Sequence, residues 1–221
     1  MLSFSMVVLL LIGVLFMGLP VAFSLGGTSL LLIALFDLPM KIVGATIFTS
    51  LDSFTVLSIP LFVLMSQILL DGRIGDDLFD VMNAWVRHLP GGLAIATILA
   101  CAFFAAITGS GAATAATIGM VAYPAMIERG YDKKFTLGLL AAGGTLGILI
   151  PPSIPLILYG SITEQSIGKL FIAGVVPGLV LTAFFVVFAV YKSMRGGFTP
   201  MEKASWGERL RVTRKNFWGI L

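Results

Sequence analysis

Two stretches of this chain place hydroxyl side chains among glycines and prolines inside otherwise apolar sequence. The first, Thr108–Thr114, has the sequence TGSGAAT, and the second, Gly143–Ser153, has the sequence GGTLGILIPPS. Hydroxyls and backbone carbonyls are hard oxygen ligands that suit a cation such as sodium, whereas helix N-termini suit a carboxylate. Because neither Leu93–Ile127 nor Phe135–Ile162 contains an acidic residue, a cation bound here would be held mainly by neutral oxygens. The hydroxyls are those of Ser110, Thr114, Thr117, Thr145 and Ser153.

The first stretch separates two apolar runs, Leu93–Ile107 and Ala115–Ile127. Each run is shorter than the ~20 residues that cross a bilayer as one helix, and together they would form a helix of about 35 residues, which is too long. The glycines and serine between them have poor helix propensity. The sequence therefore predicts a re-entrant helical hairpin over 93–127 with irregular backbone at its tip. Such backbone is tolerated at membrane depth only where it is buried in protein or lines a wet cavity, so the tip is a candidate binding site.

The second stretch predicts a broken helix. The apolar half-span Phe135–Ile148 is followed by three prolines in five residues, at positions 151, 152 and 155, and Leu156–Ile162 resumes the apolar pattern. Proline lacks an N–H donor and blocks continuous helix. Hairpin tips and broken helices direct carbonyls, amide donors and helix dipole ends at one spot, so we expect the break to face the hairpin tip.

The composition indicates an all-α polytopic membrane protein. Of the 221 residues, 58% are hydrophobic and 11% are charged, which is far more apolar than one soluble core could hide. The single cysteine, Cys101, excludes a disulfide framework or cysteine metal cluster within this sequence. The apolar pattern predicts about five transmembrane helices in addition to the hairpin, one of which is the broken helix. We also expect a polar loop over Asp71–Asp77 and a membrane-surface helix over Leu78–Leu89.

These elements divide the chain into six regions. They are scaffold-type transmembrane helices (1–70), an interfacial arm helix and turn (71–92), the re-entrant hairpin (93–127), the broken helix (128–162), the last transmembrane helix (163–191) and a basic cytoplasmic amphipathic tail (192–221). Basic residues flank the two ends of the hairpin and recur along the tail, which places both the hairpin ends and the tail on the cytoplasmic side. Because five crossings is an odd number, a second copy of this unit would be inverted, as in many secondary transporters.

An ordered series of motifs resembles the large membrane subunit of TRAP (tripartite ATP-independent periplasmic) transporters over essentially the whole chain. The principal motifs are Ala106–Gly119 and Gly144–Ser153, and further ones are Gly18–Ala22, Ile59–Phe62 and Gly174–Gly178. The resemblance implies half of an inverted-repeat, elevator-type importer that couples sodium to the uptake of organic acids such as C4-dicarboxylates or sialic acid. It implies a location in the inner membrane of bacteria or archaea.

The resemblance also implies partners and site residues. The partners are a small four-helix membrane subunit, a periplasmic substrate-binding protein and a second-half polypeptide of the large subunit. Carried over by position, the sodium ligands (Na+) would be Gly109, Ser110, Gly111, Gly144, Thr145 and Gly147. The residues expected to bind the carboxylate substrate are Thr108, Ser110, Thr114, Pro152 and Ser153.

The sequence departs from the family in two respects. The family tip usually has the sequence Gly-Ser-Ser, whereas here Gly111 replaces the second serine, so that only backbone could serve there. The family subunit is also roughly twice this length, and the chain resembles its first repeat alone, as a split gene product, a truncated reading frame or a fragment.

Of three other functions, two stay open from the sequence alone and one is disfavoured. A non-transporting half or scaffold subunit is the main alternative, and another sodium-coupled elevator family for dicarboxylates or citrate is the second. A membrane enzyme is disfavoured because the spans carry no nucleophile-and-base set, and the only histidine, His88, lies in the predicted surface helix. We expect no nucleic-acid partner, since the basic tail has no accompanying soluble domain.

Overall fold

The computed structural model describes residues 2–52, 54–198 and 200–216, which are mostly α-helical and contain no strand. The predicted all-α membrane fold is confirmed. The helices are α1 (Leu2–Phe16), α2 (Val21–Leu35), α3 (Lys41–Leu51), α4 (Phe54–Asp71), α5 (Ile74–Val86), α6 (Gly92–Thr108), α7 (Gly111–Glu128), α8 (Lys133–Leu149), α9 (Ile154–Ile162), α10 (Ile167–Arg195) and α11 (Trp206–Lys215).

Two helical stretches within the described residues are long and apolar enough to cross a membrane. They are Lys133–Ile162, which contains the proline break, and Ile167–Arg195. Lys41–Leu51 and Val56–Asp71 are long and apolar enough only if they are counted together, and they would then add a third span. Helices α1 and α2 have 15 residues each, or about 22 Å, less than the ~30 Å of a hydrocarbon core. The five membrane crossings expected from the sequence therefore remain a prediction.

The chain divides into two compact units, Met1–Phe54 and Thr55–Leu221. In the first unit α1 packs against α2 across a turn at Gly18, whose φ of 79° suits a residue without a side chain. The buried Ser24 hydroxyl of α2 donates to the Pro20 carbonyl at 3.3 Å, which satisfies a polar group inside the pair. All residues of the candidate site lie in the second unit.

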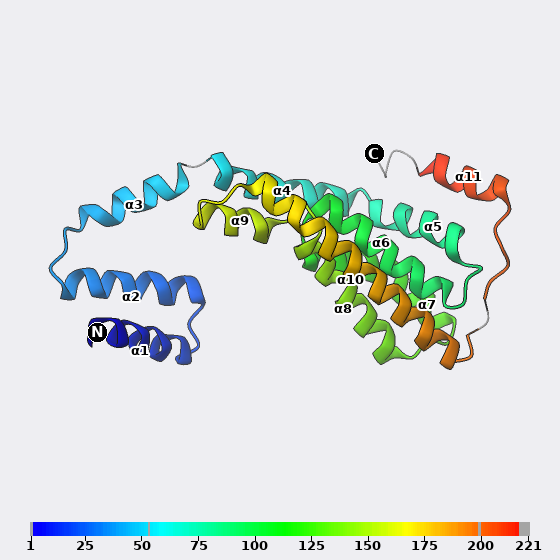
Figure 1. Cartoon of the computed structure of the whole chain (residues 1–221), viewed down its shortest axis with the longest axis horizontal. Helices are drawn as coiled ribbons and strands as arrows, with labels where there is room; N and C mark the ends of the chain where they lie inside the picture. The colour runs from blue at the N-terminus through cyan, green and yellow to red at the C-terminus, as the bar shows by residue number, and fades with distance from the viewer. Residues whose placement is uncertain (1, 53, 199, 217–221) are drawn as a thin grey trace. The chain divides into compact units, whose positions relative to one another are not determined.

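The core of the second unit is built around α6. Figure 1 shows α6, α7, α8 and α10 side by side, and α6 packs against each of the other three and against α5. The largest fully buried side chains include Phe104 and Ile98 of α6, Leu78 of α5, Met126 of α7 and Leu146 of α8. Small residues let the backbones approach: a Cβ on Gly143 would lie 2.6 Å from the Cys101 sulfur. The hairpin and the first half of the broken helix therefore form one packed body.

The loop expected over Asp71–Asp77 is shorter than predicted, and this expectation was wrong. Helix α4 continues to Asp71, and α5 already begins at Ile74, so only Gly72 and Arg73 form the turn. Asp76 and Asp77 occupy the first turn of α5, where acidic side chains are stabilised by the positive end of the helix dipole. The charges that indicated a loop thus stabilise the start of a helix.

Candidate functional site

The hairpin tip is a two-residue turn. Helix α6 ends at Thr108, Gly109 adopts a left-handed conformation with φ 62°, and α7 begins at Gly111. Ser110 is extended, and its hydroxyl oxygen accepts the Ala113 N–H at 3.4 Å as an N-cap. The Thr114 hydroxyl donates to the Ser110 carbonyl at 2.7 Å. Local capping therefore confines the irregular backbone, which we expected over Thr108–Thr114, to Gly109 and Ser110.

The break between α8 and α9 is also compact. It covers 150–153, contains a cis peptide bond between Pro151 and Pro152, and is followed by Pro155 in the first turn of α9. The Ser153 side chain is fully buried, and its hydroxyl donates to the Ile148 carbonyl at 2.7 Å. This bond satisfies one of the carbonyls left free at the end of α8.

The tip is seated directly against the break and the last turns of α8. A Cβ on Gly147 would lie 2.7 Å from the Gly111 nitrogen and 2.8 Å from the Ser110 carbonyl oxygen, and one on Gly109 would collide with the Pro152 carbonyl oxygen. The Ile154 N–H donates to the Gly109 carbonyl at 3.4 Å. The two elements that the sequence predicted to face one another are in backbone contact, and this contact requires glycine.

Gly111 has a packing role in this contact. A Cβ at position 111 would lie 2.7 Å from the Gly144 carbonyl oxygen, and one on Gly144 would lie 2.9 Å from the Gly111 carbonyl oxygen. The two glycines thus bring two carbonyl groups close to the junction of α7 and α8. A serine at position 111 would have to displace one of these backbones, which gives a physical reason for the departure from the family tip.

The oxygens gathered here are neutral. They are the carbonyls of Gly109, Gly111, Gly144 and Pro152 and the hydroxyls of Ser110, Thr114 and Ser153. Within the described residues no group of three histidine, cysteine, aspartate or glutamate side chains could hold a metal ion. Hard neutral oxygens match the ligand preference of an alkali cation rather than of a transition metal, so the donor set fits sodium.

The structure brings most of the predicted site residues together. Thr108 and Thr114 are fully buried in the hairpin, and Gly144, Gly147 and Ser153 are buried on the facing element. Thr145 is placed differently: its side chain is exposed, and its hydroxyl donates to the Ala142 carbonyl at 2.6 Å. Because Thr145 lies one residue beyond Gly144, the helical rotation turns it away from the glycine face that meets the hairpin.

Sequence reasoning missed two residues of α4 at this site. The buried Ser66 hydroxyl lies 3.0 Å from the Thr108 carbonyl and 2.8 Å from the Phe62 carbonyl, and donates to them. Ser66, Gln67 and Ser110 line a small pocket of about 130 Å³ together with apolar residues of α4 and α9. The available signal was the adjacent polar pair Ser66-Gln67 inside an apolar run. Ser66 thus ties α4 to the hairpin tip.

Replacing Ser66 with alanine is expected to lower the free energy of unfolding by about 1 kcal/mol, because the Thr108 carbonyl loses its partner in a buried position. Hydrogen exchange around residues 107–111 should accelerate. Ser29→Ala is the control, since its exposed hydroxyl donates only to Leu25 of its own helix. Equal effects of the two substitutions on stability and exchange would contradict the tie between α4 and the tip.

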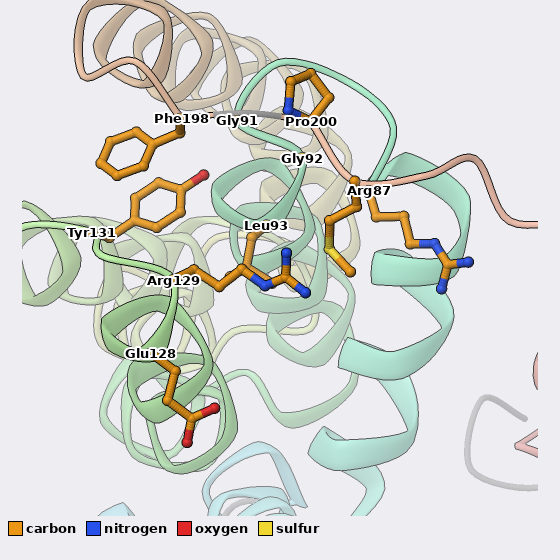
Figure 2. A pocket seen from close by; sticks show the side chains of 10 residues that line it. Arg87, Gly91, Gly92, Leu93, Glu128, Arg129, Tyr131, Phe198 and Pro200 are labelled. Carbon is orange, nitrogen blue, oxygen red and sulfur yellow. The ribbon is translucent and has the colours of Figure 1, made fainter.

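A larger pocket lies at the opposite end of the hairpin, where α6 begins and α7 ends (Figure 2). It has a volume of about 450 Å³, and none of the predicted site residues lines it. Figure 2 shows Arg129 extending toward Leu93 while the Glu128 carboxylate points away. Tyr131 stacks on Phe198 with ring centroids 3.9 Å apart, and burial raises the pKa of Tyr131. This pocket therefore lies at the end of the second unit that carries Arg87 and Arg129, and it is not part of the hairpin tip.

The basic tail is folded back onto α5. The Arg87 guanidinium forms a two-pronged ion pair with Glu208, with N–O distances of 2.8 and 2.9 Å, and the Trp85 indole N–H donates to the Thr213 hydroxyl at 3.1 Å. The Arg209 side chain is buried, and its guanidinium lies 5.6 and 5.5 Å from the ring centroids of Trp85 and Trp206. Helix α11 is therefore anchored by specific contacts rather than by its amphipathic pattern alone.

Acidic residues cluster on α5. Burial, with the neighbouring carboxylates of Asp76 and Asp77, raises the pKa of Asp80, and the ammonium of Lys215 in α11 opposes this shift. The docked tail therefore brings positive charge to a helix that carries several like negative charges.

A helical hairpin whose tip is seated against a broken helix is an arrangement that secondary transporters use. Residues 8–221 match the family described as "Tripartite ATP-independent periplasmic transporter, DctM component". The chain belongs to this family of TRAP transporter large permeases, so the suspected relationship is confirmed.

Curated relatives support the same assignment. The chain is 36% identical to a C4-dicarboxylate TRAP transporter large permease protein of Rhodobacter capsulatus, over 96% of this chain and 52% of the relative. It is 42% identical to the corresponding protein of Pseudomonas aeruginosa, over 90% of this chain and 47% of the relative. It is 32% identical to a sialic acid TRAP transporter large permease protein of Vibrio cholerae, over 95% of this chain and 49% of the relative. The chain thus spans about half the length of these relatives, which are permeases and not enzymes.

Proposed function

We propose that this chain is part of a sodium-coupled, binding-protein-dependent permease that imports organic acids by an elevator mechanism. The observation that carries the proposal is the glycine-mediated contact between the hairpin tip and the break after α8. This contact gathers backbone carbonyls, hydroxyls and helix ends in a region that lacks acidic side chains. Such a region suits a cation and a carboxylate together, because each neutralises the charge of the other.

Sodium would be held by the carbonyls and hydroxyls at the junction of the tip and α8. Gly109, Ser110, Gly111, Gly144 and Gly147 form this junction, and Thr145 would contribute through its backbone, since its side chain is exposed. When bound, sodium supplies a positive charge that helps to close the tip on the break. The residues that hold it do not titrate near neutral pH, so we expect sodium binding to vary little with pH.

The carboxylate would bind beside the sodium ion, at the start of α7 and α9. Both helices begin after a serine, at Ser110 and Ser153, and the N-terminus of a helix carries partial positive charge. The substrate class proposed is an organic acid such as a C4-dicarboxylate or sialic acid, the compounds named for relatives of this chain. Thr108, Thr114 and Pro152 would shape the site, since their side chains or carbonyls lie in the same junction.

Coupling requires that sodium bind the substrate-ready state more tightly than the empty one. The packed body of hairpin and broken helix would move as a unit against scaffold helices in a multi-pass inner-membrane assembly. The proposed partners are a small four-helix membrane subunit, a periplasmic binding protein and a polypeptide that supplies the second half. Basic residues at the hairpin mouth, among them Arg87, Arg129 and Lys134, would lie on the cytoplasmic side.

The test is thermal stabilisation by sodium, measured on this chain alone and again with a co-expressed second-half polypeptide. We expect sodium chloride to raise the melting temperature above that in potassium chloride at equal ionic strength, and Ser110→Ala to abolish this sodium-specific increment. Ser110 is an N-cap, so its loss also lowers baseline stability by about 1 kcal/mol. The sodium increment, rather than the baseline, is the informative quantity.

Ser205→Ala is the matched control, since Ser205 is also an N-cap whose side chain accepts a backbone N–H, at the start of α11. It should lower the baseline and leave the sodium increment intact. In the complete transporter, carboxylate uptake into proteoliposomes should require sodium. Uptake that is equally fast in potassium would refute the coupling, and a sodium increment that survives Ser110→Ala would refute the proposed site.

A further inference from the structure

An apolar groove runs between α8 and α10 on the surface of the second unit. It has a volume of about 710 Å³, and its walls are formed by aromatic and aliphatic side chains of Phe135, Leu139, Phe184 and Phe188. Phe184 and Phe188 are 66% and 52% exposed. The groove lies between helices that are long and apolar enough to span a membrane.

The groove is open because α8 carries small residues along it. A Cβ on Gly138 would meet no atom within 4 Å, and Ala142 follows one turn later on the same side. Elsewhere on α8 the glycines are in close contact with the hairpin, as at Gly143 and Gly147. Gly138 is therefore not required by packing within this unit, and its effect is to leave a slot beside the phenylalanines.

One end of the groove is cationic. Lys134 and Lys192 line it there, and a contiguous pocket of about 180 Å³ adds Arg195, whose guanidinium lies 4.8 Å from the Tyr191 ring centroid. Asp132 is the acidic residue lining both pockets, and its carboxylate is engaged in accepting the Phe135 N–H at 2.9 Å. Three cations thus face a single carboxylate that already caps a helix.

We propose that this groove is a binding site for one anionic phospholipid. The acyl chain would lie in the slot over Gly138, and the phosphate would be held by Lys134 and Lys192. Charge complementarity selects this occupant. A zwitterionic lipid offers the same phosphate but brings a head-group cation among Lys134, Lys192 and Arg195, and a wholly apolar helix brings no negative charge at all. The site is separate from the hairpin tip and does not depend on sodium coupling.

The test uses the purified full chain in detergent with dioleoyl phosphatidylglycerol, dioleoyl phosphatidylcholine or inorganic phosphate. Binding is followed by native mass spectrometry and by the lipid-induced rise in melting temperature. We expect phosphatidylglycerol to bind at least about tenfold more tightly than phosphatidylcholine, because the choline cation of phosphatidylcholine would be repelled by the lysines that hold the phosphate. Inorganic phosphate should give no stabilisation, since it cannot use the slot.

Two variants separate the parts of the site. Gly138→Leu should fill the slot and weaken phosphatidylglycerol at least about tenfold, while raising the lipid-free melting temperature through its helix propensity. Gly44→Leu is its control, since Gly44 is also helical and open, in α3. The double variant Lys134→Gln, Lys192→Gln should remove the preference for phosphatidylglycerol, whereas Lys169→Gln, in the first turn of α10, should retain it.

Three results of these binding measurements would overturn the proposal. They are equal binding of the two lipids, stabilisation by inorganic phosphate alone, and unchanged phosphatidylglycerol binding by Gly138→Leu. Occupation of the groove by a partner polypeptide that phosphatidylglycerol cannot displace would also overturn it. Because the Gly138→Leu protein is expected to be more stable than the parent without lipid, loss of binding cannot be explained by misfolding.

Discussion

Replacing Gly147 with alanine is expected to force the hairpin tip away from α8 and to abolish the function of the site. The added methyl group would lie 2.7 to 2.8 Å from backbone atoms of Ser110 and Gly111, which cannot rotate away as a side chain could. Overpacking of this kind costs about 1–3 kcal/mol, and the gain in helix propensity offsets only about 0.5–1 kcal/mol of it. The net cost is then up to about 2.5 kcal/mol, and we expect the melting temperature to fall by up to about 10 °C.

The matched control for this prediction is Gly138→Ala, in the same helix. A Cβ there meets nothing within 4 Å, so the substitution should be neutral or stabilise the chain by about 0.5–1 kcal/mol. In the complete transporter, Gly147→Ala should lower carboxylate uptake at least about tenfold, since an energetic mismatch of 1.4 kcal/mol at the site already has that effect. If Gly147→Ala were as stable and as active as Gly138→Ala, the tip could not be seated on α8 as described.

The sequence was sufficient to predict the elements whose ends are marked locally. The hairpin expected over 93–127 is found as Gly92–Thr108 and Gly111–Glu128, because Gly91 and Gly109 end or start helices in left-handed conformations. The break after α8 follows from its prolines, which no continuous helix accommodates. These signals act within a few residues of one another, so a linear sequence carries them in full.

Features that depend on distant parts of the chain could not be predicted in this way. Ser66 meets the Thr108 carbonyl across 42 residues, and Arg87 meets Glu208 across 121 residues. The amphipathic pattern of the tail indicated that it has a buried face but not that Trp85 and Arg87 would bind it. The placement of Thr145 likewise depends on which face of α8 meets the hairpin, and that face is chosen by Gly143, Gly144 and Gly147 together.

Replacing Gly109 with alanine is expected to be the most damaging single change at the tip, because two costs add. Gly109 has a φ of 62°, where alanine is strained by about 1–2 kcal/mol, and an added Cβ would also collide with the Pro152 carbonyl oxygen. With an overpacking cost of about 1–3 kcal/mol, the melting temperature should fall by about 6–12 °C. The sodium-specific increment in stability should be lost, since the Gly109 and Pro152 carbonyls would be driven apart.

Gly130→Ala distinguishes the two costs. Gly130 also has a positive φ, 81°, but a Cβ there meets nothing within 4 Å, so its substitution carries the conformational strain alone. The difference in melting temperature between the two variants therefore measures the contact between the tip and Pro152. A difference close to zero would mean that the tip and the break do not touch in the membrane, and the neutral-oxygen site proposed at their junction would then lack one of its two sides.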